Sequence, residues 1–331
     1  MRIIVQSDVE RLLPVRDCVD VMARAMAATS RGDVTLPIRQ FIPVPDAPGK
    51  LAVMPGTLGD PACFGIKLVC KYERPPIGSQ RDPLGTHVGM VMLFDSAKGV
   101  PLAMIEGSSL TAIRTSAASA LATRHLARED ARHLAVLGNG EQAMRHVAAM
   151  IAVRPIETIS VWGRNRERAQ DFADEVAAQT GLPVHCRADV AAAVAESDII
   201  CTTTSAKTPI LSGADLRPGQ HVNLVGSAIA ASAEVDDAAV ASSRFYVDYR
   251  PAAMAAAGEL LNAIANGAVE ESHIVGEIGE VVSGKVAGRQ NSQEITMYKS
   301  LGVASQDLAA AHAIWTMAEA ENSGLEVDLL A

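Results

Sequence analysis

Aromatic residues are scarce in this sequence, where 2 Trp, 4 Tyr and 5 Phe make up 3% of 331 residues. A carbohydrate groove lined by aromatic rings, or a platform that stacks single-stranded bases, has few residues from which to be built. A surplus of positive charge is missing as well, because 29 Lys and Arg stand against 38 Asp and Glu, for a net charge of −9. Proteins that neutralise nucleic-acid phosphates carry the opposite balance, so we expect no nucleic-acid partner.

Cysteine clusters and long apolar runs are also missing. The five cysteines are an odd number and include no Cys-x-x-Cys pair, which argues against a disulfide framework and a zinc site, and we expect no metal. No uninterrupted run of about 18 apolar residues occurs, and the apolar start Ile3–Val5 is too short for a secretory signal. These absences predict a cytoplasmic protein without a membrane segment.

The sequence does contain enough apolar material for a large core. Hydrophobic residues make up 49% and charged residues 20%, a balance typical of a globular chain. At roughly 100 to 200 residues per domain, a chain of 331 residues favours two domains.

The first hundred residues mix two kinds of periodicity. Residues 15–29 carry apolar side chains at helical spacing, whereas residues 66–72 and 89–94 have the composition of strands. Residues 73–85, between these strands, are rich in Pro, Gly and charge, which predicts a loop that could act as a lid or contact a substrate. Residues 109–127 predict a long helix. This part of the chain therefore predicts an α+β domain.

From Arg132 onward, short apolar strands alternate with helices. Strands separated by helices of about 10 to 15 residues specify a parallel, doubly wound sheet. The predicted fold class is therefore α/β, a Rossmann domain combined with the α+β domain. We expect strands at residues 133–137, 158–162, 198–203 and 221–225, and helices at residues 141–153 and 166–180.

A dinucleotide fingerprint follows the first of these strands. It reads Gly138-Asn139-Gly140-Glu141-Gln142-Ala143, a G-x-G-x-x-A pattern at a strand-to-helix junction. In this pattern Gly138 makes the tight turn, Gly140 lets the backbone approach a pyrophosphate, and Ala143 permits close helix packing. The helix start would hold the phosphates. Because glycine turns between strand and helix are common, the βαβ pattern around the glycines carries the prediction of a dinucleotide site at residues 138–142.

The end of the second strand predicts which dinucleotide is bound. NAD-binding proteins place Asp or Glu there to accept from the ribose 2′-hydroxyl, but this sequence has Gly163 followed by Arg164, Asn165 and Arg166. Two guanidinium groups can hold a 2′-phosphate through charge-assisted contacts. We therefore favour NADP(H). NAD(H) is the alternative if Arg164 stacks on adenine and Arg166 is a solvated charge.

Hydroxyl and glycine residues follow two later strands. Thr203 and Thr204 come where a doubly wound fold passes under the dinucleotide, although hydroxyls after a strand are also common caps. We expect these two threonines, with Gly226 and Ser227 after the next strand, to line the cofactor site.

Five further segments match a single family: Met54-Pro55, Gly65-Ile66-Lys67, Leu110-Thr111-Ala112-Ile113-Arg114-Thr115, Gly276-Glu277-Ile278-Gly279-Glu280 and Lys299-Ser300-Leu301-Gly302. Together with the glycine fingerprint they resemble the ornithine cyclodeaminase and mu-crystallin family. The resemblance implies a substrate-binding and dimerisation domain formed by residues 1–115 with 303–331, and a Rossmann domain formed by residues 116–302. It also implies a homodimer.

The resemblance also implies the substrate site. By position, Arg39, Lys67 and Arg114 hold the α-carboxylate of a small amino or imino acid, and paired cationic donors suit that group. Glu106 either orients this cluster or is a solvated loop carboxylate. Lys299 belongs to the family segment that returns beneath the nicotinamide, or is an exposed charge at a helix start.

One departure from the family favours one activity over another. Cyclodeaminases of the family carry an aspartate six residues before a glutamate, and this carboxylate transfers protons, whereas counting back from Glu234 gives Ala228. Reduction of a preformed imine needs only a hydride and one proton. We therefore favour NAD(P)H-dependent reduction of an imino acid, such as pyrroline-2-carboxylate, piperideine-2-carboxylate or a 2-oxo acid imine. A cyclodeaminase, an alanine-type L-amino-acid dehydrogenase and a non-catalytic binding protein are the alternatives.

The proton for this reduction is expected from Lys67, because a cation near two arginines should have a lowered pKa. His87, at the start of an apolar strand, is the second candidate, although a lone histidine there is more often structural. Asp248 and Asp307 are expected to be structural.

Overall fold

The computed structural model describes residues 1–47, 49–72 and 87–329. The chain forms two compact units, Met1–Arg114 with Val303–Ala331, and Thr115–Gly302. The first boundary falls inside helix α3 (Gly107–Leu126). The expected loop over residues 73–85 lies outside the described residues. Within the described ranges, no helix is long and apolar enough to cross a membrane.

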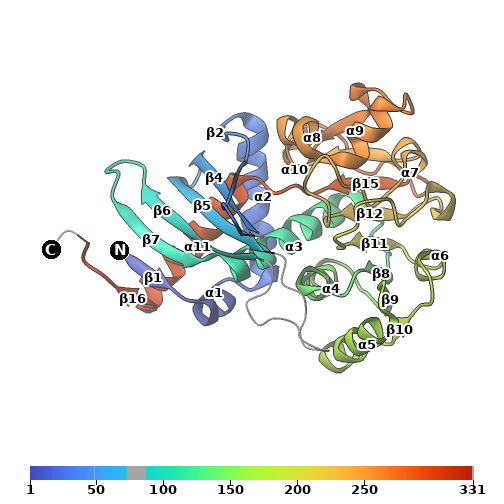
Figure 1. Cartoon of the computed structure of the whole chain (residues 1–331), viewed down its shortest axis with the longest axis horizontal. Helices are drawn as coiled ribbons and strands as arrows, with labels where there is room; N and C mark the ends of the chain where they lie inside the picture. The colour runs from blue at the N-terminus through green and yellow to red at the C-terminus, as the bar shows by residue number, and fades with distance from the viewer. Residues whose placement is uncertain (48, 73–86, 330–331) are drawn as a thin grey trace. The chain divides into compact units, whose positions relative to one another are not determined.

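The first unit contains a mixed sheet with α2 and α11 packed on one face (Figure 1). Its strands lie in the order β16-β1-β7-β6-β5-β4-β2, β3 also pairs with β4, and all neighbours are antiparallel except β1 and β7. The strands are β1 (Arg2–Ile4), β2 (Val34–Thr35), β3 (Gln40–Pro43), β4 (Gly49–Gly59), β5 (Ala62–Tyr72), β6 (His87–Asp95), β7 (Pro101–Glu106) and β16 (Leu325–Glu326). The helices are α1 (Gln6–Leu12), α2 (Val15–Arg31) and α11 (Ala304–Glu321).

The alternation of β5 decides which side chains lie under α11. Every second residue from Cys63 to Val69 is buried, and Lys67 is one of them. Gly65 lies on the same face and pairs with Gly56 of β4. A Cβ at Gly65 would lie 2.8 Å from Leu308 Cδ2 of α11. The absence of side chains at these glycines therefore lets α11 lie close to the sheet.

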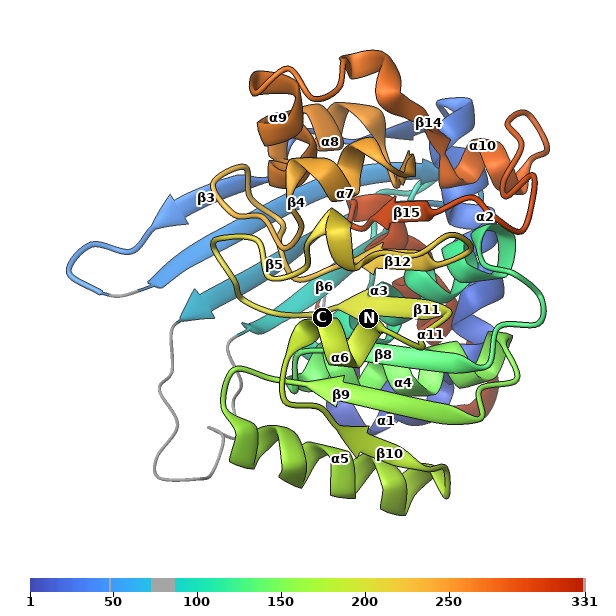
Figure 2. The same ribbon diagram turned by 90° about the vertical axis from the view of Figure 1, so that its right-hand side faces the viewer.

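The second unit is a doubly wound parallel sheet, which confirms the predicted fold class (Figure 2). The strands lie in the order β10-β9-β8-β11-β12-β15-β13-β14, and each pair is parallel. They are β8 (His133–Leu137), β9 (Thr158–Trp162), β10 (Val184–Cys186), β11 (Ile199–Thr202), β12 (His221–Leu224), β13 (Arg244–Val247), β14 (Ile274–Glu277) and β15 (Thr296–Lys299). The helices are α4 (Glu141–Val153), α5 (Arg166–Thr180), α6 (Val190–Val194), α7 (Asp237–Ala241), α8 (Arg250–Ala256), α9 (Gly258–Ala265) and α10 (Ile278–Val282).

This strand order places a topological switch point between β8 and β11. Ligands of doubly wound sheets bind outside the carboxyl ends of the strands at such a point. Strand β8 ends at Leu137, directly before the glycine turn, and β11 ends at Thr202, directly before Thr203 and Thr204. The predicted cofactor residues of both segments therefore lie at the same edge of the sheet.

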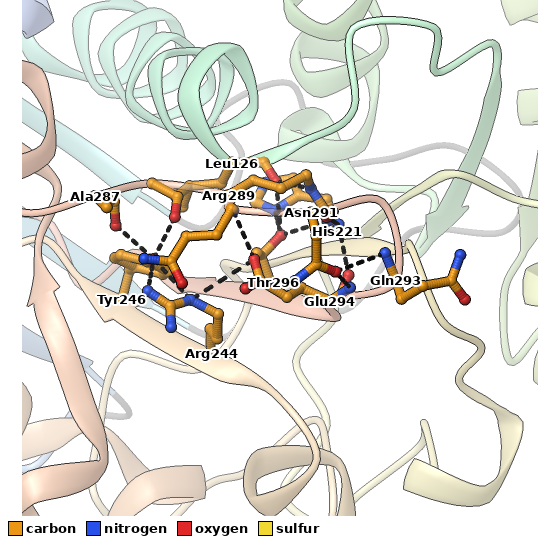
Figure 3. A network of polar contacts seen from close by, with 12 residues as sticks. Leu126, His221, Arg244, Tyr246, Ala287, Arg289, Asn291, Gln293, Glu294 and Thr296 are labelled. Atoms are coloured by element: carbon orange, nitrogen blue, oxygen red, sulfur yellow. Dashed lines mark hydrogen bonds and ion pairs between the residues drawn. The ribbon is translucent and has the colours of Figure 1, made fainter.

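A polar network around Arg289 closes the amino ends of the strands (Figure 3). The guanidinium donates to the carbonyl oxygens of Leu126 at 2.7 Å and Gln220 at 2.9 Å, and to Thr296 Oγ1 at 2.9 Å. Burial lowers the pKa of Arg289 to about 10, so it stays charged at neutral pH. The network ties the segment before β15 to the end of α3 and the start of β12. This edge of the sheet therefore has a structural role.

Candidate functional site

The turn after β8 has the geometry that a dinucleotide fingerprint requires. Gly138 has a φ of +121°, which L side chains rarely adopt, and a Cβ there would lie 2.7 Å from Thr203 Oγ1. Its N–H donates to the carbonyl oxygen of Trp162 at 2.8 Å. Glycine is therefore required at this position by both the backbone conformation and the neighbouring strand.

The start of α4 is open to an anion. Gly140 is the N-cap of this helix and provides no side-chain hydrogen bond. A Cβ at this position would meet no atom of the described chain within 4 Å. The backbone N–H groups at the start of a helix favour an anion. The side-chain oxygen of Gln142 is buried without a hydrogen-bond partner among the described residues. Together with Asn139 and Glu141 beside the turn, these features fit a pyrophosphate.

The end of β9 carries the residues predicted to read the 2′ position of the ribose. Arg164 and Arg166 are exposed, which leaves their guanidinium groups accessible to a phosphate. Asn165 Oδ1 accepts from the backbone N–H of Arg168 at 3.0 Å, so this side chain is the N-cap of α5. The helix thus uses one acceptor position of Asn165, and a contact between its amide group and the cofactor stays a prediction.

Glu234 joins the loops that follow β11 and β12. Its carboxylate accepts from Thr202 Oγ1 at 2.7 Å, from both the N–H and Oγ1 of Thr204 at 2.8 and 2.7 Å, and from Gly226 N–H at 2.7 Å. Burial raises the pKa of Glu234, while Lys299 and these hydrogen bonds act in the opposite direction. From the sequence, Glu234 served only as the reference position for Ala228, and this role was not predicted.

Lys299 is fully buried, so the interpretation of it as an exposed charge at a helix start is wrong. Its Nζ donates to Ser227 O at 2.6 Å and forms an ion pair with Glu259 at 2.9 Å. The ammonium therefore supports the loop at Ser227 from within the core and is not exposed to a cofactor. Nearby, Asp248 accepts from the N–H groups of residues 301–302 at 2.8 and 2.7 Å, which is the structural role expected of it.

Lys67 and Arg114 meet at one carboxylate oxygen in the first unit. Lys67 Nζ from β5 and Arg114 Nε from α3 each lie 2.9 Å from Asp307 Oδ1 of α11. A second nitrogen of the guanidinium, Arg114 Nη1, donates to Gln306 Oε1 at 2.9 Å. Lys67 is 3% exposed, Arg114 4% and Asp307 0%. Two of the three predicted carboxylate ligands are thus brought together by residues that the sequence analysis did not assign to the site.

Burial changes the protonation of this cluster. It lowers the pKa of Lys67 to about 7, Asp307 opposes this shift, and Arg114 and Arg39 add to it. The sequence analysis predicted the direction but named the arginines as the cause, whereas burial is the larger effect. Burial alone would raise the pKa of Asp307, but Arg114 and Lys67 outweigh it and lower the pKa. Asp307 therefore stays ionised while Lys67 exchanges its proton near neutral pH.

The other predicted substrate residues have different surroundings. Arg39 lies between β2 and β3, with its guanidinium carbon 6.0 Å from the centre of the Phe41 ring, and its charge acts on both Lys67 and Asp307. Glu106 accepts from the backbone N–H of Ser109 at 2.9 Å and from that of Ser108, so it caps α3. Glu106 is therefore not a solvated loop carboxylate, and its role in orienting the cationic cluster stays a prediction. His87 is the first residue of β6, and its side chain lies outside the described part of the structure.

A cavity of about 260 Å³ lies at the opposite edge of the Rossmann sheet, beside Arg128, Asp198 and Gln220. Asp198 already accepts from Arg128 and from two backbone N–H groups. The amide of Gln220 donates to Val194 O and Ser197 O. Arg128 Nε has no hydrogen-bond partner among the described residues, although it lies 3.4 Å from Asp130 Oδ1. Among the described residues, no group of three His, Cys, Asp or Glu could hold a metal ion.

Comparison with known proteins agrees with these features. A profile of the ornithine cyclodeaminase/mu-crystallin family matches residues 1–322. A Delta(1)-pyrroline-2-carboxylate reductase of Bacillus cereus is 34% identical over 330 residues, which cover 99% of this chain and 100% of that protein. Ketimine reductase mu-crystallin of Rattus norvegicus is 36% identical over 284 residues, 86% of this chain and 85% of the relative.

A solved structure shares the whole architecture. It is the Delta(1)-pyrroline-2-carboxylate reductase of Thermococcus litoralis, in complex with NADH and L-proline. The two structures align with a TM-score of 0.92 at 31% identity, over 99% of this chain and 100% of the other.

Carboxylate binding at Lys67 should weaken as the pH rises. Lys67 carries its charge below its pKa of about 7 and loses it above. The affinity for pyrrole-2-carboxylate, a ring carboxylate without a basic nitrogen, should therefore fall by up to about tenfold per pH unit above pH 7. Isothermal titration calorimetry between about pH 6 and 9 measures this dependence. The Lys67→Met variant is the control and should bind weakly with a flat profile, whereas a flat profile in the unaltered protein would contradict the prediction.

Proposed function

Because this chain belongs to the ornithine cyclodeaminase/mu-crystallin family, we propose that it reduces a small imino acid to the L-amino acid with NADPH or NADH. The substrate class is a cyclic ketimine, of which pyrroline-2-carboxylate and piperideine-2-carboxylate are examples. The name of the Bacillus cereus relative and the NADH and L-proline of the Thermococcus litoralis complex support this class. The buried pair of Lys67 and Arg114 is the observation that carries the proposal.

The substrate carboxylate binds to this pair. Asp307 engages one hydrogen of the Lys67 ammonium and the Nε of Arg114, and Gln306 engages Nη1. The Nη2 of Arg114 and the other ammonium hydrogens of Lys67 are therefore free of these two partners and can donate to a carboxylate. The charge of Arg39 adds to the attraction. Because the pair is buried, each charge-assisted hydrogen bond is stronger than it would be in water.

Lys67 also supplies the proton. When bound, the dinucleotide supplies the hydride to the imine carbon, and the imine nitrogen takes one proton to complete the amine. A pKa of about 7 keeps a large share of Lys67 protonated at neutral pH and still allows it to release the proton. His87 remains the second candidate for this role.

The alternatives differ in the groups that they require. Cyclodeamination of ornithine needs proton transfers at two amino groups, and Ala228 supplies no carboxylate for the second. This residue therefore favours the reductase. Oxidation of a linear L-amino acid uses the same carboxylate ligands in the reverse direction, so a dehydrogenase differs only in the shape of its substrate pocket.

NADPH is the preferred cofactor in this proposal. Gly163 provides no carboxylate to repel a 2′-phosphate, and the exposed guanidinium groups of Arg164 and Arg166 can pair with it. The pyrophosphate would lie at the start of α4, where Gly140 leaves space and the helix start favours an anion. Glu234 and Lys299 hold the loops at Thr204 and Ser227 that complete this edge of the sheet.

The active form is proposed to be a homodimer. The first unit exposes several large apolar side chains near β3 and β6, which a partner subunit could cover. They are Ile38, Phe41, Ile42, Val44, Val88 and Met90. Sedimentation equilibrium at micromolar concentration should therefore give twice the chain mass of 34.7 kDa, and a monomer would contradict this assignment.

The purified protein should oxidise NADPH when pyrroline-2-carboxylate or piperideine-2-carboxylate is added. The measurement is the loss of absorbance at 340 nm, with NADH in parallel and with pyruvate plus ammonia as a linear imine. We expect the largest kcat/KM with a cyclic imine and NADPH. Consumption of ornithine with release of ammonia, but without any imine reduction, would contradict the proposed reaction and favour the cyclodeaminase.

A variant tests the cofactor preference in the same assay. Changing both Arg164 and Arg166 to Ala should raise KM for NADPH at least about tenfold and leave KM for NADH within about twofold, because only the 2′-phosphate contacts are lost. Arg168→Ala, two residues further along α5, is the matched control. Equal losses with both cofactors would show that the arginines act elsewhere.

A further inference from the structure

Asp307 lies at the centre of the carboxylate-binding pair, although its sequence context predicts only a structural role. Its Oδ1 accepts from Lys67 Nζ and Arg114 Nε, each at 2.9 Å, so the two cationic nitrogens are separated by no more than twice that distance. All three side chains are at least nine-tenths buried. Two like charges this close in a poorly solvated interior repel each other strongly. A negative charge between them is needed before both can be held there as cations.

The packing of α11 puts Asp307 in this position. Gly56 and Gly65 lie side by side on β4 and β5, and a Cβ at either would come within about 3 Å of α11, at Ala304 for Gly56 and at Leu308 for Gly65. A side chain at either glycine would therefore push α11 away from the sheet. Asp307 directly precedes Leu308, so the same close approach brings its carboxylate to Lys67.

Stability alone gives a weak reason for this arrangement. A buried ion pair or triad often stabilises a fold no better than apolar residues of similar size, because desolvation offsets the attraction. Moreover, the second oxygen, Asp307 Oδ2, is buried and has no hydrogen-bond partner among the described residues. A purely structural carboxylate would be expected to satisfy both oxygens.

The charge balance remains favourable for a substrate. Arg39, Lys67 and Arg114 together outnumber the single carboxylate, so the cluster still attracts one more anion. Asp307 uses the Nε of Arg114 and Gln306 uses Nη1, which fixes the plane of the guanidinium and leaves Nη2 at its outer edge. The orientation needed for a carboxylate is thus set before the substrate arrives.

We propose that Asp307 is a positioning residue that holds the Lys67 ammonium and the Arg114 guanidinium side by side as one binding site for the substrate carboxylate. The inference rests on the proposed function, in which these cations bind an imino acid. Asp307 acts through Lys67 and Arg114 and does not itself touch the substrate.

Two other titratable groups among the described residues act on the cluster. Arg39 contributes positive charge from the segment between β2 and β3, and Cys18 of α2 lies within reach of the Arg114 charge. Burial raises the pKa of Cys18 to about 12, so this thiol stays neutral. Of these described groups, Lys67 is the one whose charge changes between about pH 6 and 9, and the loss of Asp307 should make it lose its proton at a lower pH.

The test compares Asp307→Asn with the unaltered full-length protein. Binding of pyrrole-2-carboxylate and of NADPH is measured separately, by calorimetry and by cofactor fluorescence. We expect the dissociation constant for the carboxylate to rise at least about 30-fold, its pH midpoint to fall by at least about one unit, and the dissociation constant for NADPH to stay within about twofold. In the imine assay, KM should rise far more than kcat falls.

Asp198→Asn is the matched control, since Asp198 is a partly buried carboxylate that pairs with Arg128 in the second unit. It should lower thermal stability without changing carboxylate affinity or its pH midpoint. If Asp307→Asn is recovered unfolded, the Asp307→Glu variant tests the proposal in its place, because it keeps the charge but moves the carboxylate oxygens by the length of one methylene group. That variant should weaken carboxylate binding about tenfold and keep the pH midpoint within about half a unit.

Two results would overturn the proposal. The first is a folded Asp307→Asn variant whose carboxylate affinity and pH midpoint match those of the unaltered protein. An Asp307→Glu variant with unaltered carboxylate affinity would count in the same way. The other is an unaltered protein that binds no carboxylate. Failure of the proposed function is distinguishable, because a protein that binds pyrrole-2-carboxylate through Asp307 but reduces no imine would retain the positioning role and lose only the reaction.

Discussion

One carboxylate oxygen, Asp307 Oδ1, bridges two buried cations, and the first unit is arranged around this contact. Lys67 and Arg114 come from a strand and a helix, and neither could be buried near the other as a cation without compensation. Asp307 on α11 supplies the compensating negative charge. The helix can lie this close to the sheet because Gly56 and Gly65 have no side chains. In the proposed function, α11 therefore contributes to the substrate site. The burial that disfavours the charged pair also lowers the pKa of Lys67 to about 7. This pKa suits Lys67 for its proposed roles in binding the carboxylate and in donating a proton.

The second unit uses buried charge in a similar way, for a different ligand. Glu234 accepts four hydrogen bonds from the loops after β11 and β12, and Lys299 holds the carbonyl oxygen of Ser227 from below. Both side chains position backbone at the edge where doubly wound sheets bind their ligands. The opposite edge is closed by Arg289 and its carbonyl partners. In both units, fully buried ionisable groups therefore hold the parts that would meet substrate or cofactor.

The second unit was the easier to predict from the sequence, because its signals are local. The strands and helices around the glycine fingerprint span consecutive residues, and the predicted ranges 133–137, 141–153, 158–162 and 166–180 agree with the structure. The partners inside the sites were not predictable in this way. Asp307 is 240 residues from Lys67 in the chain, and a single Asp in a helix has the same local pattern whether it is solvated or buried. The burial of Lys299 was not predicted for the same reason, since its partner Glu259 lies on helix α9, 40 residues away in the chain.

The binding of the substrate carboxylate by Lys67 and Arg114 can be tested in a crystal structure of the protein with NADPH and L-proline, the product of the proposed reaction. If Lys67 and Arg114 bind the substrate carboxylate, the carboxylate of proline should lie within about 3 Å of both Lys67 Nζ and the Arg114 guanidinium. Asp307 should still bridge the two cations. A proline carboxylate bound elsewhere, with Lys67 and Arg114 contacting only Asp307 and Gln306, would contradict it.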